Sequence, residues 1–146
     1  MARPEQDFQN HARFYPLYHF VAVPLLTLYT LYATYALVRA PSLATAAAVV
    51  LAAGLIAGLL ASRIMVLVVQ NRVIRLEMSM RLARVLGAAP AADALASLSV
   101  GKLVALRFAS DAELPALVAR VIAKELNSNR DVKQAIREWQ PDYLRA

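Results

Sequence analysis

The sequence contains no cysteine, and this absence removes several kinds of chemistry at once. Without a thiol, the chain forms no disulfide, no thiolate metal site and no cysteine nucleophile. It also has only two histidines, and no phosphate-binding glycine loop, HExxH or GxSxG pattern occurs. We therefore predict that the protein is not an enzyme and that it carries neither a cofactor nor a metal.

Charge is scarce over a long stretch near the N-terminus, where apolar residues replace it. Residues 17–38 are 22 residues without a formal charge, which span about 33 Å as a helix. Residues 43–62 add twenty more, and the apolar run IMVLVV follows Arg63. A hydrocarbon core is roughly 30 Å thick. The short link RAPS between the two runs predicts an antiparallel transmembrane hairpin over 14–69, with spans at about 15–38 and 43–69.

Basic residues predict the orientation of this hairpin. The net charge is +6, and the link between the spans holds Arg39 alone. Arg3 and Arg13 precede the first span, within a cytoplasmic segment over 1–13. The remaining basic residues of this region accompany or follow the second span, at Arg63, Arg72, Arg75, Arg81 and Arg84. By the positive-inside rule, both termini are expected to face the cytoplasm.

The rest of the chain predicts a helical cytoplasmic part. Residues 70–88 read as a basic juxtamembrane helix, the stalk, that continues the second span. Its arginines are predicted to face anionic lipid or a partner, at Arg72, Arg75, Arg81 and Arg84. The alternative is that these arginines serve only as a signal for membrane topology. Residues 89–97 read as an Ala/Pro-rich connector, and 98–146 as a small helical tail. The predicted fold class is an all-α membrane protein.

Capping patterns divide the tail into three short helices. A serine at 97 or 99 starts the first, which ends near Phe108. Ser110 and Glu113 form a capping box for a helix over about 111–126, and Ser128 with Asp131 repeats that spacing. The last helix is expected to run through Trp139 until Pro141. Its docking residues are predicted to be Phe108, Trp139 and Tyr143.

Two groups of side chains in the spans are predicted to pack. Tyr29, Tyr32 and Tyr35 share one helix face, which suits interfacial anchoring and packing, or else a partner helix or a pigment-like cofactor. Small residues recur every four places at Gly54, Gly58 and Ser62, a spacing that lets two helix backbones approach closely. They would pack against the first span or against another subunit.

Histidine and carboxylate chemistry is limited in this membrane region. His11 and His19 lie eight residues apart, about 12 Å along one helix, so they cannot clamp one iron from opposite sides. His19 would at most ligate a tetrapyrrole metal singly, and the alternative is an interfacial histidine bonded to lipid or protein. Neither span carries a carboxylate, which leaves no proton relay through the hairpin.

Three phrases of the sequence carry a family resemblance. QNHARFYPLYHFVAVPLL, then LVALRFASDAELPALV and KQAIREWQPDYLR, resemble a family of small bacterial membrane proteins known only as a domain of unknown function, the 6526-type. The specific part is LRFASDAELP. The resemblance covers nearly the whole chain and implies a two-span hairpin with a helical cytoplasmic tail. It implies no activity.

These observations predict a non-catalytic inner-membrane accessory or scaffolding subunit. Its tail would dock on a larger membrane-protein complex, with respiratory or photosynthetic energy-transducing complexes as the suggested hosts. The alternative is a free-standing homo-oligomer that binds or organises anionic lipid. Nucleic acid is disfavoured, because the stalk arginines lie close to the membrane and no stacking aromatics accompany them.

Overall fold

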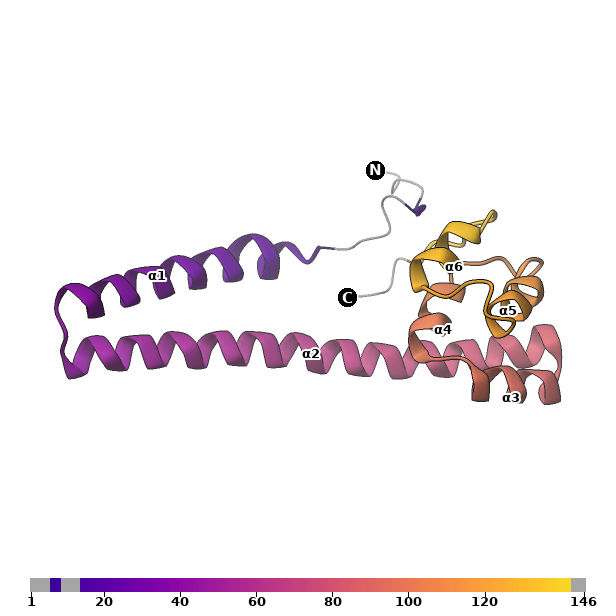
Figure 1. Ribbon diagram of the computed structural model, residues 1–146, viewed down its shortest axis with the longest axis horizontal. Helices are drawn as coiled ribbons and strands as arrows, with labels where there is room; N and C mark the ends of the chain where they lie inside the picture. The colour runs from indigo at the N-terminus through magenta and orange to yellow at the C-terminus, as the bar shows by residue number, and fades with distance from the viewer. Residues whose placement is uncertain (1–5, 9–13, 143–146) are drawn as a thin grey trace. The chain divides into compact units, whose positions relative to one another are not determined.

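The computed structural model describes residues 6–8 and 14–142, which contain six α-helices, one π-helical segment and no strand. The all-helical prediction is therefore confirmed for these residues. Contacts divide the described chain into two units (Figure 1). The first unit comprises residues 14–67. The second comprises residues 68–142 together with 6–8. His11 and Tyr143, named above as a candidate ligand and a docking residue, lie outside the described residues.

The first apolar run forms a π-helical segment, Leu17–Ala22, that passes directly into α1, Val23–Arg39. Pro24 explains the wide turn. Proline lacks an N–H, and its ring clashes with the carbonyl four residues earlier in a regular α-helix. The π-turn relieves this clash, and the N–H of Val23 donates to the carbonyl of Tyr18, five residues back. The apolar run thus stays helical across its proline.

The second apolar run and the stalk form one uninterrupted helix, α2, Leu43–Leu86. Its 44 residues correspond to about 66 Å. Ser42 and Thr45 begin it with reciprocal hydrogen bonds, in which each side-chain oxygen accepts the other residue's N–H, at 3.1 and 2.9 Å. Gly87 ends it with a φ of +89°, a conformation that glycine adopts without strain. The second apolar run therefore continues into the stalk as a helix, as predicted.

Both long helices are long and apolar enough to cross a membrane, and only 6% of either apolar window is buried within the chain. A core helix of a water-soluble domain buries most of its apolar residues. Here the large side chains point outward along most of the run, and the buried ones in residues 14–67 are the small Ala33 and Ala52. Most of the apolar surface of this unit is therefore not covered by other described residues of the chain.

Residues 89–97, expected to be a connector, instead lie in a helix, α3, Ala88–Ser97. Pro90 is the residue that had suggested a connector rather than a helix. It occupies the third helical position, where the backbone N–H has no intrahelical partner, so proline is tolerated there. Ala91 and Ala94 are buried on the inner face of α3. The alanines therefore pack as a helix face, and the connector is helical in this structure.

The three tail helices form near their predicted positions but are shorter, and the second begins after Glu113 rather than after Ser110. Helix α4, Val100–Leu106, begins at Ser99, whose hydroxyl accepts the N–H of Lys102. Helix α5 is Leu114–Ile122, because Pro115 has no N–H to complete an earlier turn. Helix α6, Asn129–Ala135, begins at a complete Ser128–Asp131 capping box. It ends four residues before Trp139, which was expected to lie within it.

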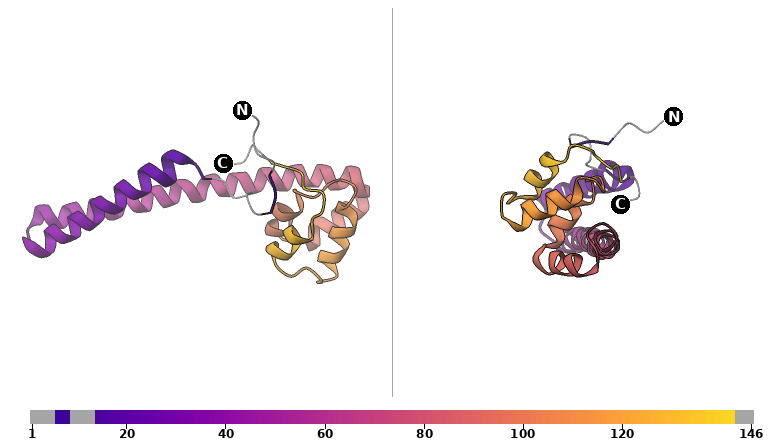
Figure 2. Two further views of the ribbon diagram at one scale, coloured as in Figure 1. Left: turned by 90° about the horizontal axis from the view of Figure 1, so that it is seen from above. Right: turned by 90° about the vertical axis from the view of Figure 1, so that its right-hand side faces the viewer.

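The core of residues 68–142 lies between the end of α2 and the tail helices (Figure 2). Every fourth residue of the stalk is buried, at Ile74, Met78 and Leu82. The tail buries its own apolar side chains against this stripe, at Leu103, Leu106, Leu114, Leu117, Val118 and Val132. Other large apolar side chains of the stalk stay exposed, at Val73, Leu76 and Met80. The tail therefore covers one face of the stalk.

Candidate functional site

Two groups of arginines among the described residues differ in their partners: those that pair with Asp111 or Asp142, and those that line hollows with no carboxylate at ion-pair distance. Arg81 belongs to the first group and is the most connected. Its Nε donates to a carboxylate oxygen of Asp111 at 2.6 Å, and its Nη1 to the carbonyl of Arg107 at 3.0 Å. Its Nη2 donates to the carbonyl of Ala109 and to the amide oxygen of Gln140. Its side chain is only 14% exposed.

Arg84 and Arg107 complete this first group. Arg84 donates to the second carboxylate oxygen of Asp111 at 2.8 Å. Arg107 pairs with Asp142 at 3.1 Å and lies over the ring of Phe108, 4.4 Å from its centroid. The hydrogen bond from Arg81, helped by the charges of Arg81 and Arg84, holds the pKa of Asp111 below its ordinary value. Arg81 and Arg84, expected to face lipid or a partner, both pair with Asp111 of the tail, and the Arg84 side chain remains 70% exposed.

The phrase LRFASDAELP is the centre of this arrangement, and Glu113 is its main acceptor. The capping box is present, with reciprocal 3.3 Å bonds between Ser110 and Glu113. The Glu113 carboxylate also accepts the backbone N–H groups of Arg137 and Glu138, at 3.1 and 3.2 Å. The sequence identified the capping role alone. The second role brings two distant segments together, and no local pattern signals it.

Phe108 and Trp139, predicted to dock the tail, contact each other. Their rings stack with centroids 4.5 Å apart and an interplanar angle of 16°. The N–H of Gln140 donates to the carbonyl of Phe108 at 2.6 Å, and Ala109 and Trp139 form an isolated antiparallel bridge. Trp139 therefore belongs to an extended segment packed within the tail.

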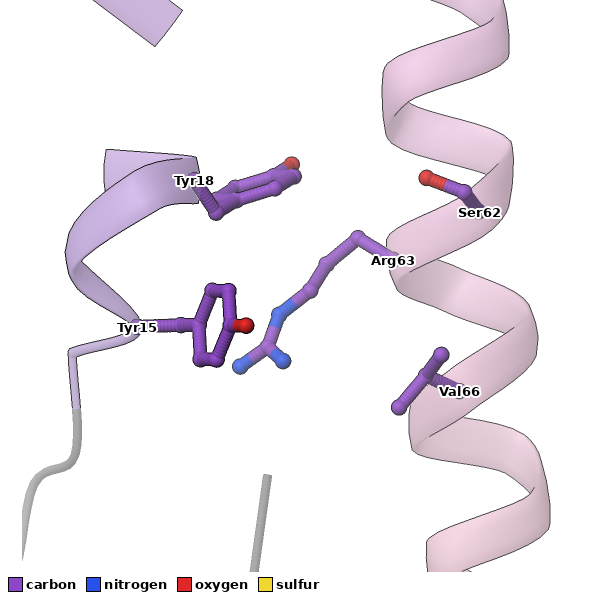
Figure 3. A pocket seen from close by; sticks show the side chains of 5 residues that line it. All are labelled: Tyr15, Tyr18, Ser62, Arg63 and Val66. Carbon is purple, nitrogen blue, oxygen red and sulfur yellow. The ribbon is translucent and has the colours of Figure 1, made fainter. Parts of the chain in front are cut away.

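The second group of arginines lines hollows. Arg63 shares a hollow of about 240 Å³ with Tyr15, Tyr18, Ser62 and Val66 (Figure 3). All five belong to residues 14–67. The guanidinium lies 6.0 Å from the centroid of the Tyr18 ring, within cation–π range. We call these five residues the Arg63 hollow. From the sequence we used Arg63 only to predict the orientation of the hairpin. The available signal for a site was a single charged residue within an apolar run.

Arg72 and Arg75 line a second hollow, of about 450 Å³, on the stalk. Leu76, Ser79 and Leu95 complete its lining. Within the described ranges, neither arginine has a carboxylate at ion-pair distance. Both remain exposed, as their predicted role toward lipid or a partner requires. We call this the stalk hollow.

The remaining predicted site residues lie apart from one another. Tyr29, Tyr32 and Tyr35 are exposed on α1. A Cβ atom at Gly54 or Gly58 would meet nothing within 4 Å, and the hydroxyl of Ser62 donates to the carbonyl of Leu59. The Nδ1 of His19 lies 3.0 Å from the carbonyl oxygen of Tyr15. Among the described residues, no three metal-ligating His, Cys, Asp or Glu side chains converge.

The fold and these contacts define an all-helical protein with two helices that could span a membrane and a tail folded on the end of the second. The chain belongs to the family of unknown function DUF6526, whose model matches residues 1–146. The resemblance inferred from the sequence is therefore confirmed. No curated protein and no solved structure matches the chain.

Proposed function

We propose that this protein is a non-catalytic accessory or scaffolding subunit of the bacterial inner membrane, which docks on a larger membrane-protein complex. The observation that carries the proposal is the contrast in burial between the two units. Residues 68–142 bury a core of their own, whereas the apolar windows of α1 and α2 are 6% buried. Lipid or partner helices would cover the exposed apolar surface.

In this proposal α1 and the first part of α2 form an antiparallel hairpin with both ends in the cytoplasm. The link of residues 40–42 is short, and residues near the start of the first span share the Arg63 hollow with residues of α2. The arginine bias supports the orientation. Alkaline carbonate washing of native membranes tests insertion: the full chain should remain in the membrane pellet. Release into the wash would contradict insertion.

The stalk contributes attachment and a docking face. Arg72 and Arg75 have no carboxylate at ion-pair distance among the described residues, and a basic residue near an anionic surface contributes on the order of 1 kcal/mol. Beside them, Leu76 and Met80 present exposed apolar side chains. An apolar stripe bordered by arginines suits a partner that meets the protein at the membrane surface.

Gentle-detergent purification from native membranes tests docking, with mass spectrometry and an absorption spectrum of the eluate. We expect one set of larger membrane proteins at fixed stoichiometry, with pigment or haem bands if the host is energy-transducing. The double variant Leu76→Ser, Met80→Ser should lose that set. The control Ile122→Ser, an exposed apolar residue on α5, should retain it. Recovery of the wild-type chain alone would contradict docking.

A second candidate function, a homo-oligomer that organises anionic lipid, is favoured by the open glycine face. Since a Cβ at Gly54 or Gly58 meets nothing, these glycines are not used for packing within the chain and suit close approach of a second helix. Gly54→Leu, Gly58→Leu should then abolish self-association in sedimentation. The matched control Ala53→Leu, Ala57→Leu makes the same helix bulkier on a neighbouring face and should not. Equal oligomer size in all variants would contradict this candidate.

A further inference from the structure

Arg63 places a positive charge within an apolar stretch of α2. Twenty uncharged residues precede it from Leu43, and six apolar residues follow. Among the described residues, no carboxylate lies at ion-pair distance from its guanidinium. A charge in apolar surroundings is costly unless an opposite charge or strong acceptors compensate it. The described chain supplies Arg63 with an aromatic face but no counter-ion.

The polar groups that surround the Arg63 hollow are mainly donors. Figure 3 shows the phenols of Tyr15 and Tyr18 on one side and the Arg63 side chain extending toward them from α2, with its guanidinium beside Tyr15. The hydroxyl hydrogen of Ser62 is engaged by the carbonyl of Leu59 at 2.8 Å. A guanidinium with two nearby phenolic hydroxyls recognises an anion with several acceptor oxygens, and a phosphate has this chemistry.

The position of the hollow along the helices suits a lipid headgroup. As a helix, residues 43–62 span about 30 Å, the thickness of a hydrocarbon core. Arg63 then falls at the level where phosphates lie, and Tyr15 and Tyr18 lie at the start of the first span, at the same boundary. Val66 gives the hollow an apolar wall, and exposed apolar side chains continue along both helices. The acyl chain of a lipid whose headgroup occupies the hollow would lie against these apolar side chains.

We infer that the Arg63 hollow binds the phosphate of an anionic phospholipid from the cytoplasmic leaflet. Arg63 provides the charge and a paired set of N–H donors, and Tyr15 and Tyr18 provide phenolic donors and shield the guanidinium from water. Lipid supplies the missing counter-ion. This site rests on the membrane insertion proposed above, and it is separate from the stalk hollow because it shares no residue with it.

Native mass spectrometry of the full chain in detergent tests the site, with titration of phosphatidylglycerol and phosphatidylcholine. Arg63→Gln should weaken the first phosphatidylglycerol bound by about tenfold or more. The control Arg39→Gln also removes one positive charge, at the C-terminal end of α1 and outside the hollow, and should leave that affinity within about twofold. Arg63→Lys should fall between wild type and Arg63→Gln, because lysine keeps the charge but lacks the planar fork. Tyr18→Phe should also weaken binding.

Three outcomes of the lipid titration would overturn the inference. They are equal affinity of wild type and Arg63→Gln, equal loss in Arg39→Gln, and equal binding of the two lipids. Displacement of the lipid by millimolar inorganic phosphate would assign the hollow to a free anion and would also overturn it. Unchanged Trp139 fluorescence and helix content verify folding of each variant. Carbonate washing separates the two proposals, since release of the chain contradicts membrane insertion, whereas retention with equal lipid affinity contradicts the lipid site alone.

Discussion

The two units of the chain differ in what satisfies their charged and apolar groups. In residues 68–142, Arg81, Arg84 and Arg107 pair with carboxylates of the same unit, and a core of apolar side chains is buried. In residues 14–67, Arg63 has no carboxylate partner among the described residues, and the apolar side chains are exposed. The described residues therefore satisfy the charged and apolar groups of the tail, but in the other unit they leave much of the apolar surface uncovered and the Arg63 charge without a carboxylate partner.

Removing Arg81 should have the largest effect on the tail. Arg81→Ala leaves Asp111 without its main partner and two backbone carbonyls without a donor, so we expect a loss of about 3 kcal/mol in the free energy of unfolding. Urea unfolding of the full chain in detergent, followed by the fluorescence of Trp139, measures it. Arg72→Ala is the control and should change stability by less than about 0.5 kcal/mol. Similar losses in both variants would remove the distinction between the two groups of arginines.

Removing the Glu113 carboxylate should have the next largest effect. Glu113→Ala leaves the N–H groups of Ser110, Arg137 and Glu138 without their acceptor, and we expect a loss of about 2 kcal/mol. Glu113→Gln retains one acceptor oxygen and should lose less. Glu77→Ala, on the exposed side of the stalk, is the control. The same unfolding experiment measures all three, and an unaffected Glu113→Ala would mean that water replaces the carboxylate.

The caps of the tail provide a smaller and more local test. Ser128→Ala removes the hydroxyl that accepts the Asp131 N–H at 3.0 Å, and should cost about 1 kcal/mol. Ser99→Ala removes a longer bond, 3.4 Å, to the N–H of Lys102 and should cost less. A larger loss at Ser99 than at Ser128 would contradict this ranking of the two caps.

Acid should produce the smallest effect, through Asp111. Its pKa is lowered in the folded protein, so its contribution to stability is complete above the unfolded pKa of about 4 and is lost as the pH falls through the folded pKa. The side chain is 46% exposed, which weakens the interaction through solvent screening. The variant Asp111→Asn should be less stable than wild type at pH 7, and the difference should shrink below pH 4. A difference that is independent of pH would exclude this cause.

Sequence patterns were sufficient wherever a structure depends on neighbouring residues. The continuous helix α2, the stop at Gly87 and both capping boxes follow from local spacing. The early end of α6 does not, because the N–H groups of Arg137 and Glu138 bond to Glu113, 24 and 25 residues away. The pairing of Arg81 with Asp111 spans 30 residues in the same way. Distant partners of this kind leave no periodic signal.

The shared carboxylate of Glu113 also links the local opening of two chain segments. It accepts one N–H from the turn before α5 and two from the segment after α6. Release of either segment exposes the acceptor of the other to water, so the two ends gain little by fraying separately. Amide hydrogens at Ser110, Arg137 and Glu138 should consequently exchange with solvent deuterium at similar protection, as members of one cooperative opening unit.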